Sequence, residues 1–344
     1  MRAKALQFGK AISAALFVLL LVVVGSKNAL AQYQAATLQH EGNITAFYGP
    51  DALANAHAAA AIGDTITLSS GNFNGCLFTK AITVHGAGCS GDTVSGTSPT
   101  KVSTSYIEKG DATIPLVIEG IWFSFIQYNN GANGSRNICF NKCFIDEFKN
   151  NNYSITHKLF NSQFNNCIIK SFKYHGSGLT FVNSVVSMAY YDQLDMNDQN
   201  LIYNSIMLFN NGVKATNTMT YNSIIVTTDN NNTTNSTFYN CIGIELGNTS
   251  LFEGQLNSTN MEVTGYENVF EAFNGTVTYD NNYQLKEDIA TTFLGNDGTE
   301  VGIYGGMLPY NTRLSYMIMR RCNVAGRTTV DDKLSVEIEL NIDE

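Results

Sequence analysis

The sequence has little charge and little proline: 14 % of its 344 residues are charged, and it contains 4 prolines and 1 tryptophan. A disordered acidic chain and a coiled coil need far more charge, and a collagen needs far more proline with glycine at every third position. Those three classes are excluded. The chain has instead 40 asparagines, 17 tyrosines and 20 phenylalanines. Asparagine tolerates left-handed turns and aromatic residues favour pleated surfaces, so the composition predicts an all-β protein with many turns.

The apolar run at residues 11–24 is too short for a membrane helix, because it has 14 residues where roughly 20 are needed. Small residues follow it at 29–31, Ala-Leu-Ala. The basic residues before it are Arg2, Lys4 and Lys10. This order favours a cleaved signal peptide over residues 1–31 rather than a transmembrane anchor. We therefore expect a secreted, periplasmic or surface-held protein with no membrane span in the mature chain.

The predicted signal peptide holds four of the 20 basic residues and none of the 29 acidic ones, so the rest of the chain carries 16 − 29 = −13 charges. A surface that negative repels phosphate backbones, and nucleic acid is excluded as a partner. Capture of a polyanionic sugar would need a local basic groove or bound Ca²⁺.

A short phrase recurs six times between residues 140 and 243. It consists of an aromatic or aliphatic residue in most copies, a spacer, usually an asparagine, then a cysteine or serine, and then apolar residues. The cysteine or serine stands at Cys143, Cys167, Ser184, Ser205, Ser223 and Cys241, in steps of 24, 17, 21, 18 and 18 residues. This period is too short for helical-hairpin repeats or propeller blades. It predicts a solenoid whose coils each contain three short parallel strands and stack at about 4.8 Å.

Stacked coils bring equivalent residues into rows. The expected interior row is Phe140, Phe164, Phe181, Ile202 and Phe238. The expected asparagine row, whose amides bond from coil to coil at a tight turn, is Asn166, Asn183, Asn204, Asn222 and Asn240. The third row is the cysteine and serine set, which explains three of the seven cysteines as small buried side chains. A disulfide between Cys143 and Cys167 stays possible, and a structural zinc site finds no CxxC pair to support it.

The start and end of the solenoid have their own signals. Residues 52–61 predict a short helix capped by Asp51 and ended by Gly63-Asp64, which would cover the first coil. After Gly306, the segments 315–321 and 334–340 predict two strands that cover the last coil.

The order of these elements resembles the pectin-lyase-like right-handed parallel β-helix superfamily. The phrases that carry the resemblance are GDTITLSSGNFNG, AITVHGAG and LVIEGIWF. Residues 283–306 resemble the closing coil of a secreted bacterial group of that superfamily, whose function is mostly unassigned. The resemblance covers residues 45–310. It implies a right-handed parallel β-helix domain over 32–310 with an N-terminal capping helix, followed by a β-strand tail over 311–344.

Hydrolases of this superfamily use pairs of carboxylates, and its lyases use Ca²⁺ with a lysine or arginine base. This sequence lacks the adjacent-aspartate and Gly-His-Gly signatures of the hydrolases, and it has no cluster of acids at one-coil spacing. We therefore expect a monomeric, non-catalytic scaffold that binds a polysaccharide or cell-surface glycan or displays at the surface, with no resident cofactor. The alternative is a divergent polysaccharide lyase or glycosidase with its site near residues 170–198, in which case Ca²⁺ would bind.

The residues of that alternative site lie where a coil lengthens, because insertions build ligand loops. The candidate catalytic residues are Lys173, His175, Tyr190 and Asp192. The candidate Ca²⁺ ligands are Asp192, Asp195 and Asp198, although a solvated polar loop also explains them. Trp122 is either an exposed sugar platform or a buried member of the aromatic stack.

Overall fold

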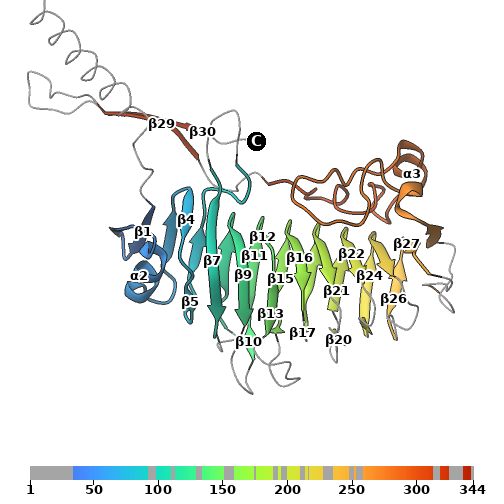
Figure 1. Cartoon of the computed structure of the whole chain (residues 1–344), viewed down its shortest axis with the longest axis horizontal. Coiled ribbons are helices and arrows are strands. Elements are labelled where there is room, and N and C mark those ends of the chain that lie inside the picture. The colour runs from blue at the N-terminus through green and yellow to red at the C-terminus, as the bar shows by residue number, and fades with distance from the viewer. Residues whose placement is uncertain are drawn as a thin grey trace, which may run out of the picture.

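The protein is a parallel β-solenoid of about 7 turns, seen here in a computed structural model. The structure describes residues 34–91, 98–109, 113–128, 134–150, 159–173, 176–188, 193–194, 200–209, 214–215, 217–227, 235–247, 252, 259–312, 318–324 and 336–341. The strands stack in chain order along the long axis of the molecule (Figure 1). The all-β prediction and the solenoid prediction are confirmed, and the expected signal peptide lies outside the described residues.

Two long sheets form the walls, and we name them sheet A, with 11 strands, and sheet B, with 12. In spatial order sheet A is β2 (Asn43–Tyr48), β1 (Ala35–His40), β3 (Thr65–Leu68), β6 (Thr83–His85), β8 (Leu116–Glu119), β11 (Ile138–Asn141), β15 (Gln163–Asn165), β18 (Thr180–Val182), β21 (Asn200–Tyr203), β24 (Thr218–Tyr221) and β26 (Thr237–Tyr239). Its pairs are parallel except for β1, which is antiparallel to both β2 and β3.

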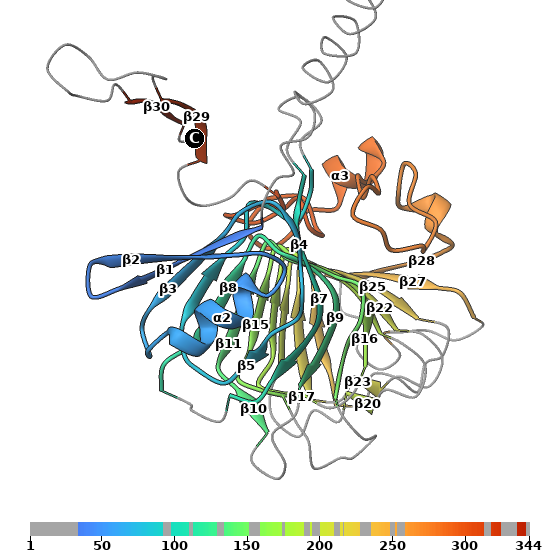
Figure 2. The same cartoon turned by 60° about the vertical axis from the view of Figure 1, so that its left-hand side comes forward.

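Sheet B forms the second wall with parallel pairs throughout. It contains β4 (Gly71–Phe73), β5 (Leu77–Phe78), β7 (Thr100–Ile107), β9 (Trp122–Tyr128), β12 (Phe144–Ile145), β13 (Phe148–Asn150), β16 (Ile168–Phe172), β19 (Val185–Met188), β22 (Ile206–Phe209), β25 (Ile224–Thr227), β27 (Ile242–Glu245) and β28 (Met261–Thr264). A narrow third wall contains β10 (Ser135–Arg136), β14 (Leu159–Phe160) and β17 (Gly176–Ser177), and beside it β20 (Gln193–Leu194) pairs with β23 (Lys214–Ala215). Figure 2 shows the wedge that sheets A and B form.

The interior contains the predicted row of phenylalanines. Phe140 and Phe164 stack with ring centroids 5.2 Å apart, and Phe164 and Phe181 stack at 5.0 Å. Ile202, Thr220 and Phe238 continue the row in register. A second interior row on sheet B contains Phe148, which stacks on Phe172 with ring centroids 5.3 Å apart. Equivalent residues of successive coils therefore stack on one another in the interior, as the repeat predicted.

The corner between sheets A and B contains the predicted cysteine and serine row. Each hydroxyl accepts a hydrogen bond from the backbone of the coil before it: Cys167 N–H donates to Ser184 Oγ at 3.0 Å, and Ser184 N–H donates to Ser205 Oγ at 3.1 Å. Cys143 and Cys167 are both free thiols, so they form no disulfide. Burial raises the pKa of the Cys241 thiol to about 12, which keeps that group protonated and inert.

The asparagine row occupies the same corner, and all five members have positive φ angles between 46° and 53°. We call Asn166, Asn183, Asn204, Asn222 and Asn240 the corner asparagines. Asparagine suits this turn because its short polar side chain tolerates the left-handed conformation. The expectation that their amides bond from coil to coil is wrong, because the side chains of Asn166, Asn183, Asn222 and Asn240 form hydrogen bonds with a distant segment of the chain.

That segment is residues 265–312, which we call the strap. It leaves the last coil and runs back along the molecule, so that Asn240 contacts Leu294, Asn222 contacts Asn296, and Asn183 contacts Ile303. The strap contains the 3₁₀ turn η4 (Tyr266–Asn268) and the helix α3 (Glu287–Thr292). Figures 1 and 2 show it above sheet B. The expectation that 283–306 closes the solenoid as a coil is therefore corrected: this segment covers the side of sheet B.

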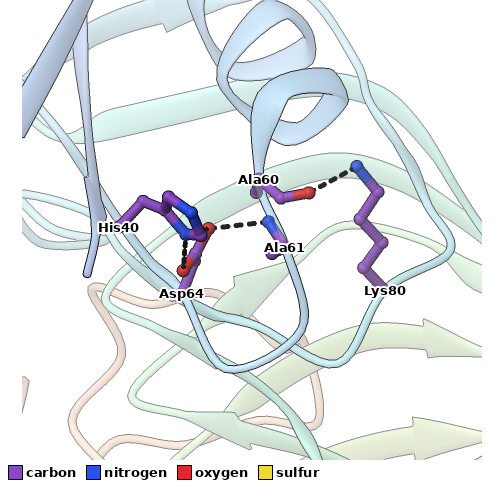
Figure 3. Close-up of polar contacts among 5 residues, drawn as sticks. All are labelled: His40, Ala60, Ala61, Asp64 and Lys80. Atoms are coloured by element: carbon purple, nitrogen blue, oxygen red, sulfur yellow. Dashed lines mark hydrogen bonds and ion pairs between the residues drawn. The ribbon is translucent and has the colours of Figure 1, made fainter.

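The first coil is covered by α2 (Ala52–Ala59), as predicted. Asp51 makes no side-chain cap to the helix, and its carboxylate accepts from Asn74 Nδ2 at 2.7 Å instead. The helix ends where Lys80 Nζ donates to Ala60 O at 2.7 Å (Figure 3). Beside it, Asp64 accepts from Ala61 N–H at 2.6 Å and pairs with His40 at 2.9 Å. These contacts fasten the β1–β2 hairpin to the capping helix. Neither α2 nor α3 has the length or hydropathy of a membrane-spanning segment, and the same holds for every described helix.

The tail forms the predicted strand pair, with β29 (Ile318–Val324) antiparallel to β30 (Val336–Asn341). The pair begins two to three residues later in the chain than expected. Figure 1 shows it apart from β26 and β27, so it does not cover the last coil as expected.

Candidate functional site

The outer face of sheet A presents one continuous row of side chains in register. We call this set the outer row. Its members are His85, Glu119, Asn141, Asn165, Val182, Tyr203, Tyr221 and Tyr239. Because side chains alternate across a strand, these residues point away from the interior row. The strap lies on the other wall (Figure 2). Among the members of the outer row, Glu119 is buried and the others are at least partly exposed.

The end of the outer row near the last coil is aromatic. The rings of Tyr203 and Tyr221 stack at 5.1 Å with planes 9° apart, and those of Tyr221 and Tyr239 stack at 5.0 Å with planes 12° apart. Tyr239 is 38 % exposed. The pKa of Tyr221 is raised, mainly by burial in the stack and to a smaller extent by the two neighbouring phenols, so its hydroxyl stays protonated. Stacked rings present their edges to solvent, which gives a line of hydrogen-bonding groups at the coil spacing.

The end of the outer row near the first coil is polar. Asn165 Nδ2 donates to Asn141 Oδ1 at 2.9 Å, so these two amides link adjacent coils. Glu119 is nearly buried, and its carboxylate lies 3.3 Å from His85 Nδ1. In this pair Glu119 meets an imidazole and not a second carboxyl group. The pair therefore lacks the two carboxyl groups that glycoside hydrolysis uses.

The outer face of sheet B is apolar and covered. Its row in register is Trp122, Phe144, Ile168, Val185, Ile206, Ile224, Ile242 and Met261. The strap buries the middle of this row under Val269, Phe270, Val301 and Ile303, among others. Trp122 is half-buried at one end, where Lys101 Nζ lies 3.6 Å from the ring centroid and Tyr279 meets its edge at 5.3 Å. It is neither an open sugar platform nor a member of the interior stack.

Of the predicted catalytic residues, the structure describes Lys173 alone. Its Nζ donates to Glu147 Oε1 at 2.7 Å, which holds it as the cation of an ion pair. Partial burial favours the neutral form of Glu147, but the hydrogen bond and charge of Lys173 outweigh it and lower the pKa of Glu147. Glu147 is therefore ionised at neutral pH and is no general acid. His175, Tyr190 and Asp192 lie outside the described residues, so their roles stay predictions.

Calcium binding also stays a prediction, because Asp192, Asp195 and Asp198 lie outside the described residues. Within the part of the chain that the structure describes, no three histidine, cysteine or acidic side chains gather as metal ligands. Asp146, on the coil before Lys170, pairs with Lys170 at 3.1 Å and accepts from Trp122 Nε1 at 3.0 Å.

Sequence reasoning missed the tyrosines of the outer row although the signal was present. The spacer of the recurring phrase is tyrosine in three successive copies, at 203, 221 and 239. A residue that follows an inward-facing position on a strand points outward. The spacers therefore predict an exposed aromatic row.

Comparisons with known proteins give no assignment: no family, no curated protein and no solved structure matches the chain.

Proposed function

We propose that the protein is an exported, non-catalytic solenoid that binds an extended glycan along the outer row. The observation that carries the proposal is a row of side chains in register on sheet A, polar at one end and tyrosine at the other, with Val182 alone apolar between them. A pyranose unit of an extended polysaccharide is about as long as one coil is thick, so successive sugars would meet successive members of the row. Tyrosine is suited to such a surface because it combines an apolar ring with a hydroxyl.

The charge of the chain favours a neutral ligand. The whole sequence carries a formal net charge of −9, and without residues 1–31 the charge is −13. Each sugar of a uronate polymer carries a negative charge that this negative protein would repel, whereas a neutral polymer would not be repelled. Membership of the pectin-lyase-like superfamily and surface display are further parts of this proposal.

Affinity electrophoresis against neutral and acidic polysaccharides tests the proposal. Tyr239→Ala removes the most exposed ring of the outer row, and Tyr106→Ala, on sheet B, removes a ring of similar exposure, 41 % against 38 %. We expect retardation by a neutral glycan, an affinity loss of at least about tenfold in Tyr239→Ala, and none in Tyr106→Ala. Absence of retardation by every glycan, or equal loss in both variants, contradicts the proposal.

The enzyme alternative is tested in the same samples by measuring reducing ends and unsaturated products with and without Ca²⁺. We expect no cleavage. Cleavage that His175→Ala and Asp192→Ala each abolish, with the fold intact, would replace the binding proposal by a divergent lyase or glycosidase.

Export is tested by sequencing the N-terminus of the protein recovered from outside the cytoplasm. We expect the mature chain to begin at Gln32, because the basic, apolar and small-residue segments occur in the order that a signal peptidase requires. An intact Met1 in exported material contradicts this expectation.

A further inference from the structure

The edge of sheet A nearest the first coil is open. β2 is the terminal strand there, and within the described part of the chain it pairs with β1 alone. Five of its six residues are exposed, among them Ile44 at 73 % and Tyr48 at 70 %. The strand contains no charged residue and no proline, which are the usual means of protecting an edge. Figure 2 shows the β1–β2 hairpin projecting beyond the solenoid.

The hairpin geometry determines which backbone groups face outward. The two turn residues have positive φ angles, Glu41 at 48° and Gly42 at 82°, as a two-residue hairpin requires. The pair beyond Ala35 and Tyr48 is bonded, because Gly49 N–H donates to Gln34 O at 2.8 Å. Bonded and non-bonded pairs alternate in antiparallel strands. The N–H and C=O groups of Ile44, Ala46 and Tyr48 therefore point to the open edge.

We propose that two copies of this chain pair through β2 as an antiparallel, two-fold symmetric dimer centred on Ala46. A two-fold axis perpendicular to the sheet places each residue opposite one on the same face, and the register centred on Ala46 satisfies this rule. Ile44 of one copy then lies opposite Tyr48 of the other, twice. The three outward-facing residues of each strand become hydrogen-bonded pairs, so the register that joins the backbones also joins the two exposed apolar side chains.

The capping helices leave room for this pairing. Helix α2 contacts β1, β2 and β3, which places it beneath β1 on the inner face of the sheet. In the dimer the two helices lie three strand spacings apart, about 14 Å, and a helix is about 10 Å wide. The strand itself is uncharged, so like charges meet only at its ends, where Glu41 of one copy approaches Asp51 of the other. Added salt should therefore strengthen the dimer.

An exposed, uncharged edge strand is better explained by a dimer than by a monomer. The proposal therefore revises the expectation of a monomer. A single pair of six-residue strands buries less area than the roughly 1,200 Å² of a stable specific interface, so the dimer should be reversible. The outer face of sheet A would then run without a break from one solenoid into the other.

Sedimentation velocity over a concentration series, with disulfide trapping, tests the proposal on the purified chain. Ala46→Cys places its two thiols at the two-fold axis, where hydrogen-bonded Cα atoms lie about 5.5 Å apart, within disulfide range. Thr45→Cys is the matched control, because it is equally close to the edge but faces the partner's Phe47. We expect Ala46→Cys to cross-link under mild oxidation and Thr45→Cys and the unmodified protein not to.

Ile44→Lys supplies the second measurement, because it adds like charge to both halves of the interface without touching the backbone. We expect it to raise the dissociation constant of the dimer at least about tenfold. Leu308→Lys, at an equally exposed position on the strap, should leave that constant unchanged. A protein that stays monomeric at all concentrations, or a dimer that survives Ile44→Lys while Ala46→Cys fails to cross-link, overturns the proposal. Glycan binding by a monomeric protein would leave the proposed function standing while this inference fails.

Discussion

The outer faces of sheets A and B come from the same coils and differ in what covers them. On sheet A the outer row consists of polar and tyrosine side chains apart from Val182, and all of its members except Glu119 are at least partly exposed. On sheet B the equivalent row is apolar, and its members Val185, Ile206, Ile224 and Ile242 are all fully buried under the strap. The coils alone therefore do not complete the core of this protein. A second hydrophobic cluster forms only when the strap returns along sheet B.

The two faces differ in what they contribute to the stability of the fold. An apolar face under a packed strap stabilises the fold by burial. An uncovered face of mixed polar and aromatic side chains contributes less to stability and is available to a ligand. Equal changes on the two faces should therefore have unequal effects on folding.

The largest expected effect is on sheet B. Phe270 is 1 % exposed and packs against Phe273 with ring centroids 5.1 Å apart. Phe270→Ala should cost about 3–5 kcal/mol of unfolding free energy, because it leaves a cavity beneath the strap. Tyr239→Ala on sheet A should cost less than about 1 kcal/mol. Urea unfolding followed by Trp122 fluorescence measures both, and equal costs would remove the distinction between the faces.

The next effect concerns the corner where the two faces meet. Asn183 Nδ2 donates to Ile303 O at 2.9 Å and to Gly305 O at 2.7 Å, whereas the buried Asn204 Nδ2 has no partner among the described residues. Asn183→Gly should cost about 1–3 kcal/mol, because glycine keeps the left-handed turn but orphans two carbonyls.

Asn204→Gly is the matched control for that variant. The two positions share a φ angle of 46°, so backbone strain cancels between them. We expect the Asn204→Gly protein to unfold at nearly the same denaturant concentration as the unmodified one. A cost equal to that of Asn183→Gly would show that the strap contacts do not account for the loss.

A smaller effect of opposite sign is expected in the interior that both faces share. Thr220 is fully buried between Ile202 and Phe238, and its Oγ1 has no hydrogen-bond partner among the described residues. Thr220→Val keeps the shape and removes the unpaired hydroxyl, so it should stabilise the protein by about 1 kcal/mol. A lower melting temperature in calorimetry would contradict this expectation.

An effect that appears only at acidic pH is expected on the cap that covers the first coil. Burial, aided by the charge of Lys80, lowers the pKa of His57 to about 4, and its Nε2 accepts from Thr79 N–H at 3.3 Å. His57 binds a proton near pH 6.5 in the unfolded chain and only near pH 4 in the folded chain. Its contribution to stability is therefore fully present above pH 6.5 and is lost as the pH falls from 6.5 to 4. Unfolding between pH 7 and pH 4 should show this loss.

His57→Gln is the control for that measurement, because it removes the titrating ring. The nearby pair of His40 and Asp64 changes stability with pH in the opposite direction. Because the pKa of His40 is raised, the pair adds stability below about pH 6.5, until Asp64 itself takes up a proton. The difference between the unmodified protein and His57→Gln isolates the His57 contribution. Parallel pH profiles would contradict it.

Local repetition made much of the solenoid predictable. The phrase around Phe164-Asn165-Asn166-Cys167 identifies an inward aromatic residue, a left-handed turn and a small buried side chain, and the structure confirms each. The capping helix was predictable because its apolar residues and its end signals are adjacent in the chain. The candidate surface was half predictable, since the tyrosine spacers were visible but were not interpreted as an outer row.

The path of the strap was not predictable in this way. Asn183 and Ile303 are 120 positions apart, and the sequence around either residue does not indicate that it contacts the other. Residues 283–306 resemble a closing coil because they share its glycines and aliphatic residues. Glycine is required at position 305 for a different reason. A Cβ there would lie 1.6 Å from the Glu300 carbonyl oxygen, within a turn of the strap itself.

By itself the sequence determined the all-β class, the coil period, the rows of like residues and the cap of the first coil, because each depends on residues one coil apart or closer. Only the tertiary structure decided which wall stays open. The aliphatic positions of sheet B and the tyrosines of sheet A both fit a strand, and their exposure depends on where a segment more than a hundred residues away comes to lie. Burial depends on the whole fold, because the strap returns over sheet B and covers its apolar row but not the outer row of sheet A.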